Sequence, residues 1–193
     1  MILAALRLFI FSTAALAVAS CDRPDALGAA ELSDAFRFEP DLIDTDGEPA
    51  AKARFVGERS VVYFGFANCP DVCPTALGRL TAALDLLDET GPVYEAYFIT
   101  VDPERDTPGA LADYLAFDER ITGLSGEPEN VRALLEDMHV YAEREDLPES
   151  AIGYTMAHTS LFYVIDEAGA PTHAIVDRLT PQELADTLRA VAR

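Results

Sequence analysis

The chain has 193 residues, of which 34 are acidic and 14 are basic, so its formal net charge at pH 7 is −20. This charge excludes the basic surface that phosphate backbones require, and we expect no nucleic-acid partner. Half of the residues are hydrophobic, which is too many for a disordered acidic tail and enough to bury one core. Three cysteines are too few for a small disulfide-stapled domain. One domain is therefore predicted after removal of an N-terminal leader.

Residues 1–20 have the pattern of a signal peptide: a single charge, Arg7, precedes an apolar run and then small residues. The letters V-A-S-C resemble the cleavage site of bacterial lipoproteins, so we expect cleavage before Cys21 and a lipid on its thiol. Residues 21–35 are predicted to be a polar tether. An uncleaved membrane helix is the alternative. Either way, we expect the domain, residues 36–193, to face the periplasm from the bacterial inner membrane.

The remaining sequence alternates between strand and helix patterns. The predicted strands are a short strand or hairpin at 36–43 with a turn at 45–47, then 60–66, 93–101, 140–142, 161–165 and 173–176. The predicted helices are 74–89, one starting at Thr107 and Pro108, 129–138, and one starting near Pro181. Residues 143–157 are predicted to be a loop. This alternation, which ends in a hairpin and a helix, predicts an α/β sandwich with a largely parallel centre.

Cys69 and Cys73 lie in the segment FGFANCPDVCPTAL, directly after the buried strand 60–66. Functional groups of βα units gather in the loop at the carboxyl end of the strand. We expect Cys73 at the helix cap and Pro74 at the first helical position. Free backbone N–H groups and the helix dipole favour a negative sulfur there, so both thiols are expected to ionise readily.

Three functions are open to this cysteine pair. A structural disulfide would close only a five-residue ring, which removes little chain entropy. A catalytic dithiol is a stronger alternative, although thioredoxin pairs are separated by two residues and this pair by three. Two thiolates also suit Cu(I), whereas Cu(II) or Zn(II) would need further ligands. A metal site would therefore take a third ligand from elsewhere in the chain.

The chain has three histidines that could supply this ligand. His139 lies where a helix is predicted to pass into a strand, and His173 begins an outer hairpin strand, so both are interpreted as structural or surface residues. His158 comes just before the apolar strand 161–165 and is the preferred candidate. Met156 could add a soft sulfur ligand, but core packing is the simpler interpretation.

Three motifs in this order resemble the Sco/SenC proteins: FGFANCPDVCPTAL, VDPERDTP at 101–108 and AHTSLFYVID at 157–166. The resemblance covers essentially the whole domain. It implies a thioredoxin-like three-layer sandwich with a central mixed sheet. It also implies that Cys69, Cys73 and His158 bind one copper ion, as Cu(I), Cu(II) or both. Such proteins deliver copper to the CuA centre of cytochrome c oxidase or reduce the cysteines of that centre.

Asp102 follows the second buried strand, and a parallel sheet would place it beside the cysteine loop. A carboxylate there could order a ligand or the loop through a hydrogen bond, and the resemblance points the same way. The alternative is that Asp102 caps the turn at Pro103. Asp106 or Thr107 is expected to cap the next helix, and Asp71 is interpreted as a turn residue.

The leading hypothesis is a membrane-tethered copper chaperone that is not an enzyme. The enzymatic alternative is a thiol-disulfide reductase that acts on the CuA cysteines. His158 lies where thioredoxin-like oxidoreductases usually have a cis-proline, and no proline occurs in 154–161, which favours metal binding. A peroxidase is less suitable because its threonine and arginine pattern is not evident. The expected partners are subunit II of cytochrome c oxidase, other periplasmic copper carriers or thiol reductants, and the membrane through the lipid anchor.

Overall fold

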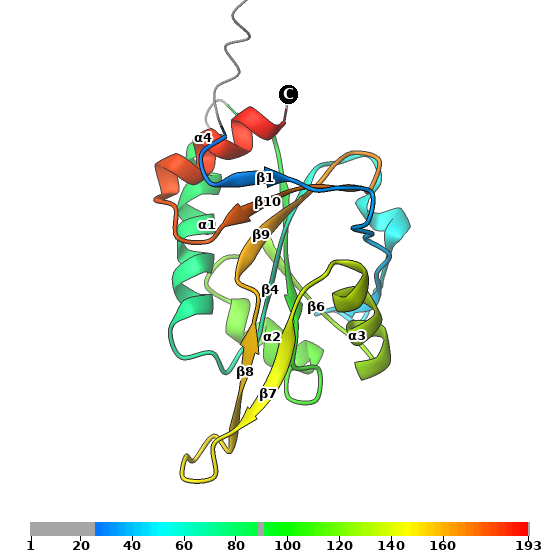
Figure 1. The fold of residues 1–193 in the computed structure, drawn as a ribbon, viewed down its shortest axis with the longest axis vertical. Coiled ribbons are helices and arrows are strands. Elements are labelled where there is room, and N and C mark those ends of the chain that lie inside the picture. Colours follow the sequence, from blue (N-terminus) through cyan, green and yellow to red (C-terminus); the bar gives the residue numbers. More distant parts are fainter. Residues whose placement is uncertain (1–25, 89–90, 193) are drawn as a thin grey trace, which may run out of the picture.

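The computed structural model describes residues 26–88 and 91–192, which fold into an α/β sandwich (Figure 1). Within these residues an eight-stranded sheet forms the middle layer, and a separate two-stranded sheet projects from it as an arm. The predicted signal peptide, 1–20, and the predicted lipidation site, Cys21, lie outside the described residues.

The eight-stranded sheet has a parallel centre and antiparallel edges. Its strand order is β1-β10-β9-β4-β5-β6-β2-β3. Strand β5 runs parallel to both β4 and β6, whereas β9 is antiparallel to β4 and β2 is antiparallel to β6. The predicted central mixed sheet is therefore confirmed. The strands are β1 (Ala29–Glu31), β2 (Asp41–Asp44), β3 (Pro49–Ala51), β4 (Ser60–Gly65), β5 (Glu95–Thr100), β6 (Ile121–Ser125), β9 (Leu161–Ile165) and β10 (Pro171–Val176).

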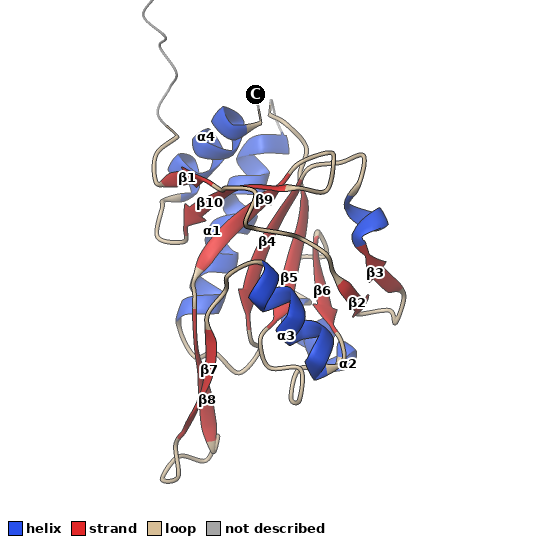
Figure 2. Cartoon of the chain, turned by 45° about the vertical axis from the view of Figure 1, so that its right-hand side comes forward, coloured by secondary structure: helices blue, strands red, loops and turns tan. Residues whose placement is uncertain are grey.

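The described residues also form four α-helices and one 3-10 turn, η1 (Lys52–Phe55). Helices α1 and α4 pack against each other, and α3 lies across the other face of the sheet (Figure 2). Within this part of the chain, no helix has the length and apolar character needed to cross a membrane. The helices are α1 (Val72–Asp88), α2 (Pro108–Leu115), α3 (Pro128–Asp137) and α4 (Pro181–Val191).

Strand β4 explains where the cysteine loop lies. All six of its residues are buried, which accounts for its almost continuous apolar sequence, because a central strand is covered on both faces. The chain leaves β4 at the carboxyl edge of the parallel strands and enters α1. Cys69 and Cys73 are therefore at the edge where α/β proteins usually place functional groups.

The N-terminal part of the sheet differs from the prediction in two places. Ala29–Glu31 pairs with β10, so the sheet extends into the segment predicted as a tether, 21–35. The strand predicted at 36–43 begins only at Asp41, but the predicted hairpin is present because β2 pairs with β3. Its turn includes Gly47, whose φ of 83° suits glycine.

The prediction of a loop at 143–157 is wrong in a way that matters for function. Strands β7 (Ala142–Asp146) and β8 (Tyr154–His158) form the projecting two-stranded sheet. Four of the five β7 residues are exposed, so the strand lacks the alternation of apolar and polar residues that reveals a half-buried strand. Strand β6 was also not predicted. Its sequence, ITGLS, is short and contains a glycine.

Candidate metal centre

The two cysteines lie at the start of α1 in different environments. The helix begins at Val72, so Cys73 lies in its first turn and not at the predicted cap position. The backbone N–H of Cys73 donates to the Sγ of Cys69 over 3.3 Å, so the Cys69 sulfur satisfies a free N–H at the helix start. Cys73 is buried, whereas Cys69 is half-buried.

Gly65, at the end of β4, lets Cys73 pack against the sheet. A Cβ at this position would lie 3.0 Å from the Sγ of Cys73 and 2.7 Å from Cε2 of Phe98. Real Cβ atoms essentially never come as close as 2.7 Å, and a contact of 3.0 Å is unusually tight, so a larger residue would force the phenylalanine, and with it the cysteine, to shift. The glycine is therefore part of how the chain positions its buried sulfur.

The expectation that both thiols ionise readily is correct for one cysteine and wrong for the other. The hydrogen bond from the Cys73 thiol, aided by backbone N–H groups including those of Asp71 and Val72, lowers the pKa of Cys69 to about 5. Donation of that same hydrogen bond, together with burial, raises the pKa of Cys73. The pair therefore combines an accessible thiolate with a buried, protonated thiol.

His158 approaches this pair from the end of β8. Its Nε2 lies 3.7 Å from the Sγ of Cys73, and its Nδ1 lies 2.9 Å from the carbonyl oxygen of Thr159. Because a carbonyl can only accept, the Nδ1–H donates to it and the lone pair of Nε2 faces the sulfur. The rings of Tyr63 and Phe66 meet the imidazole edge to face. This orientation is the one that a metal ligand needs.

The cysteine loop and the arm meet across a pocket of about 270 Å³. On one side it is lined by Cys69 and neighbouring residues of the cysteine loop. On the other side it is lined by Met156, His158 and their neighbours near the base of the arm. Met156 also packs against the core, which agrees with the packing role preferred in the sequence analysis. A small ion or a partner's side chain can therefore reach the half-buried sulfur and the imidazole from the same side.

The residues present fit copper in type and are close together. Two sulfurs and one imidazole nitrogen form a donor set that suits Cu(I) and can also hold Cu(II). Within residues 26–88 and 91–192, however, no three Cys, His, Asp or Glu side chains already form a metal-binding group.

The other two histidines have different surroundings. The ring of His139 packs against Phe36, and its Nε2 lies 3.3 Å from the carbonyl oxygen of Ala35. His173 lies on β10 opposite Glu31 of β1, and burial lowers its pKa. These contacts agree with the structural or surface roles expected from the sequence.

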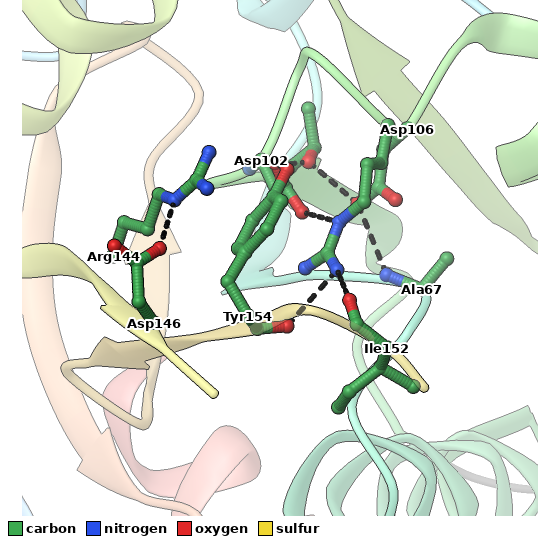
Figure 3. Close-up of polar contacts among 9 residues, drawn as sticks. Ala67, Asp102, Asp106, Arg144, Asp146, Ile152 and Tyr154 are labelled. Carbon is green, nitrogen blue, oxygen red and sulfur yellow. Dashed lines mark hydrogen bonds and ion pairs between the residues drawn. The ribbon is translucent and has the colours of Figure 1, made fainter. Parts of the chain in front are cut away.

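Asp102 contacts the arm and not the cysteine loop. Its buried carboxylate forms an ion pair with Arg105 and accepts a hydrogen bond of 2.9 Å from the hydroxyl of Tyr154, in β8 (Figure 3). The prediction placed Asp102 beside the cysteines, but its hydrogen bonds lead to the strand that carries His158.

Asp106 is the acidic residue that holds the cysteine loop. Of the two candidate caps, Thr107 caps the helix, because its hydroxyl accepts from the N–H of Ala110. One oxygen of the Asp106 carboxylate accepts from the N–H of Ala67 over 3.0 Å and from the hydroxyl of Thr100 over 2.7 Å (Figure 3). Burial raises its pKa. Apart from a second aspartate after a buried strand, no sequence pattern indicates this contact.

Comparisons with known proteins agree on one family. The SCO1/SenC family model matches residues 27–193. An SCO2-like protein of Rickettsia conorii is 33% identical over 150 residues, which cover 77% of this chain and 73% of the relative. The copper-bound structure of Bradyrhizobium japonicum ScoI has a TM-score of 0.72 at 33% identity and covers 79% of this chain and 97% of its own. Yeast Sco1 has a TM-score of 0.73 at 30% identity, with coverages of 80% and 95%. The predicted thioredoxin-like fold is confirmed.

Proposed function

We propose that this chain, which belongs to the SCO1/SenC family, binds one copper ion and passes it to the CuA centre during assembly of cytochrome c oxidase. One observation carries the proposal: His158 is far from the two cysteines in the sequence, yet it lines the same pocket as Cys69, and its Nε2 lies 3.7 Å from the buried sulfur of Cys73. The copper-bound structure of the Bradyrhizobium relative supports the choice of metal.

The two sulfurs are suited to different steps of copper handling. Cys69 is half-buried and its lowered pKa makes it a thiolate at neutral pH, so it can meet incoming Cu(I) directly. Cys73 is buried and protonated, so it must release its proton when it binds the ion. The Nε2 of His158 then completes a three-coordinate site. Copper leaves when a partner's thiolates replace these ligands, which begins at the accessible Cys69.

We further propose that Cys21 carries the lipid anchor and that the domain faces the periplasm from the inner membrane. The sequence pattern of the leader supports this arrangement. The acidic surface would be repelled by anionic headgroups, so a covalent anchor would be needed to hold the domain at the membrane. The partner would be subunit II of cytochrome c oxidase, with periplasmic copper carriers or thiol reductants acting before it.

Titration of the reduced protein with Cu(I) and with Cu(II) tests this function. Absorption and electron paramagnetic resonance should report one ion with sulfur ligation. His158→Ala should lose most Cu(II) retention, because two sulfurs alone leave Cu(II) short of ligands. His139→Asn is the matched control, since it removes an exposed imidazole and asparagine tolerates the positive φ of 49° at that position. If His158→Ala retains copper like the parent, the three-ligand site is wrong.

A thiol-disulfide reductase is the second candidate, and the asymmetry of the two thiols favours it specifically. An accessible thiolate beside a buried thiol is the arrangement used for disulfide exchange, in which the first sulfur attacks and the second resolves the mixed disulfide. Exchange needs both cysteines but not the imidazole. His158→Ala should therefore keep most of its exchange rate with a disulfide substrate if reduction is the main function.

A further inference from the structure

The arm that carries His158 is not part of the central sheet. Strands β7 and β8 pair only with each other, and they project beyond the body of the domain (Figure 1). At the base of the arm, Thr159 donates to Tyr141 O over 2.9 Å, and its hydroxyl accepts from Tyr141 N over 3.1 Å. These bonds join the two arm strands to each other. No backbone–backbone hydrogen bond joins residues 142–158 to the rest of the described chain, so side chains and the chain connections at residues 141 and 159 hold the arm in place.

One face of β8 makes those contacts. Side chains two residues apart lie on the same face of a strand, so Tyr154, Met156 and His158 point in one direction. Met156 packs against the core, and His158 faces Cys73. Tyr154, at the far end of the strand, is therefore the contact that can fix the direction of β8.

Tyr154 is held by two residues of the loop between β5 and α2. Its hydroxyl donates to Asp102, while the guanidinium of Arg105 lies 3.6 Å from the centre of its ring. Arg105 Nη1 also donates to the carbonyl oxygen of Tyr154 over 3.0 Å, and its Nε pairs with Asp102. Arg144 of β7 lies 3.8 Å from the same ring centre, so two guanidinium groups enclose the ring. Figure 3 shows Tyr154 between Arg144 and Asp102.

These residues connect the arm to the cysteine loop through a continuous chain of hydrogen bonds. The backbone N–H of Asp102 donates to the hydroxyl of Thr100, and that hydroxyl donates to Asp106. Asp106 in turn accepts from the N–H of Ala67, two residues before Cys69. Five buried or half-buried residues, with Tyr154 at one end and Ala67 at the other, therefore span the distance between β8 and the loop that carries the sulfurs.

We propose that Arg105 and Tyr154 are positioning residues that set His158 at the correct place relative to Cys69 and Cys73. The inference rests on the proposed function, since it takes His158 to be a copper ligand. The pair acts by fixing β8 against the β5–α2 loop, and neither residue touches the metal. Residues that orient a ligand typically change metal affinity by about 10- to 100-fold when they are replaced.

Tyr154→Phe and Arg105→Lys test the proposal. The first removes the hydroxyl that meets Asp102 and keeps the ring, and the second keeps the charge but loses the planar fork that stacks and donates. Both should lower Cu(II) affinity about tenfold or more. In the metal-free protein both should also speed hydrogen exchange at the amides of residues 154–158. Tyr141→Phe is the matched control, because it removes an exposed tyrosine–carboxylate contact, with Glu143, beside the same arm.

A double-mutant cycle separates positioning from a general loss of stability. If Tyr154 acts through His158, Tyr154→Phe should cost no further affinity in a His158→Ala background. The reduction potential of the Cys69–Cys73 pair should also stay unchanged. The proposal would be overturned if Tyr154→Phe lowered copper affinity equally in both backgrounds. It would also be overturned if hydrogen exchange at residues 154–158 stayed as slow as in the parent. If His158→Ala alone binds copper normally, the proposed function fails. The hydrogen-exchange rates at residues 154–158 still decide whether Tyr154 fixes β8.

Discussion

The two halves of the candidate copper site are built in contrasting ways. The sulfur half belongs to the body of the domain: it follows the fully buried β4, enters α1, and packs Cys73 against the sheet. The imidazole half consists of His158, the last residue of β8, and this strand pairs only with β7 among the described strands. Backbone structure fixes the first half, and side-chain contacts fix the second.

This difference indicates which half can move when copper arrives or leaves. A sulfur packed in a dense core can shift little, because interiors have few voids and transmit strain. An arm that is held by one tyrosine, its partners Asp102 and Arg105 and a few packing contacts can open at a lower cost. The cysteines therefore form the fixed base of the site, and the contact to His158 is the adjustable one.

Removal of the buried sulfur should have the largest effect. Cys73→Ala leaves one sulfur and one imidazole, so Cu(I) affinity should fall by at least about 100-fold, the upper range for a residue that only orients a ligand. Competition against a chromophoric Cu(I) chelator measures it. Val72→Ala, an exposed neighbour in the same helical turn, should bind like the parent. A loss of less than about tenfold for Cys73→Ala would mean that the body of the domain does not provide the base of the site.

The sulfur half could be predicted from the sequence because the local sequence patterns and the overall fold favour the same structure there. An apolar run, two cysteines, a proline and a helical pattern follow one another, so β4, the loop and α1 could be placed within a few residues. The predicted helix start was two residues late, since α1 begins at Val72 and not at Pro74. The contrast between the two thiols needed coordinates, because it depends on which sulfur donates to the other.

The imidazole half could be predicted from the sequence only in part. His158 could be selected from three histidines, but the arm that carries it looked like a loop, because β7 is exposed and charged. The contacts of Asp102 and Asp106 could not be predicted for a similar reason. Both residues end up beside the carboxyl edge of the sheet, and only side-chain geometry decides that Asp106 meets Ala67 while Asp102 meets Tyr154.

The difference between the two thiols gives a pH-dependent prediction. Because its pKa is lowered to about 5, Cys69 should be a thiolate from pH 6 upwards, and its alkylation rate should fall about tenfold per pH unit below 5. Cys73, whose pKa is raised, should stay unmodified by iodoacetamide at pH 7 in the folded protein. Mass spectrometry after timed labelling identifies the modified residue.

Two controls sharpen this prediction. Unfolding in denaturant should make both thiols titrate near the ordinary value of about 8.5. Cys73→Ala should raise the pKa of Cys69, since the thiol of Cys73 makes the largest contribution to lowering it. Equal labelling of both cysteines at pH 6 in the folded protein would contradict the assignment of one accessible thiolate and one buried thiol.

The smallest of these effects tests the packing beneath the sulfur half. Gly65→Ala places a methyl group 2.7 Å from Phe98 and 3.0 Å from the Cys73 sulfur, so the free energy of unfolding should fall by about 1–3 kcal/mol. Gly78→Ala is the matched control, because an added Cβ there meets nothing within 4 Å, and it should stabilise α1 by about 0.5–1 kcal/mol. Urea unfolding measures both. If Gly65→Ala also weakens Cu(I) binding while Gly78→Ala does not, the core itself sets the position of the buried sulfur; if copper binding is unaffected, the packing around Gly65 does not set that position.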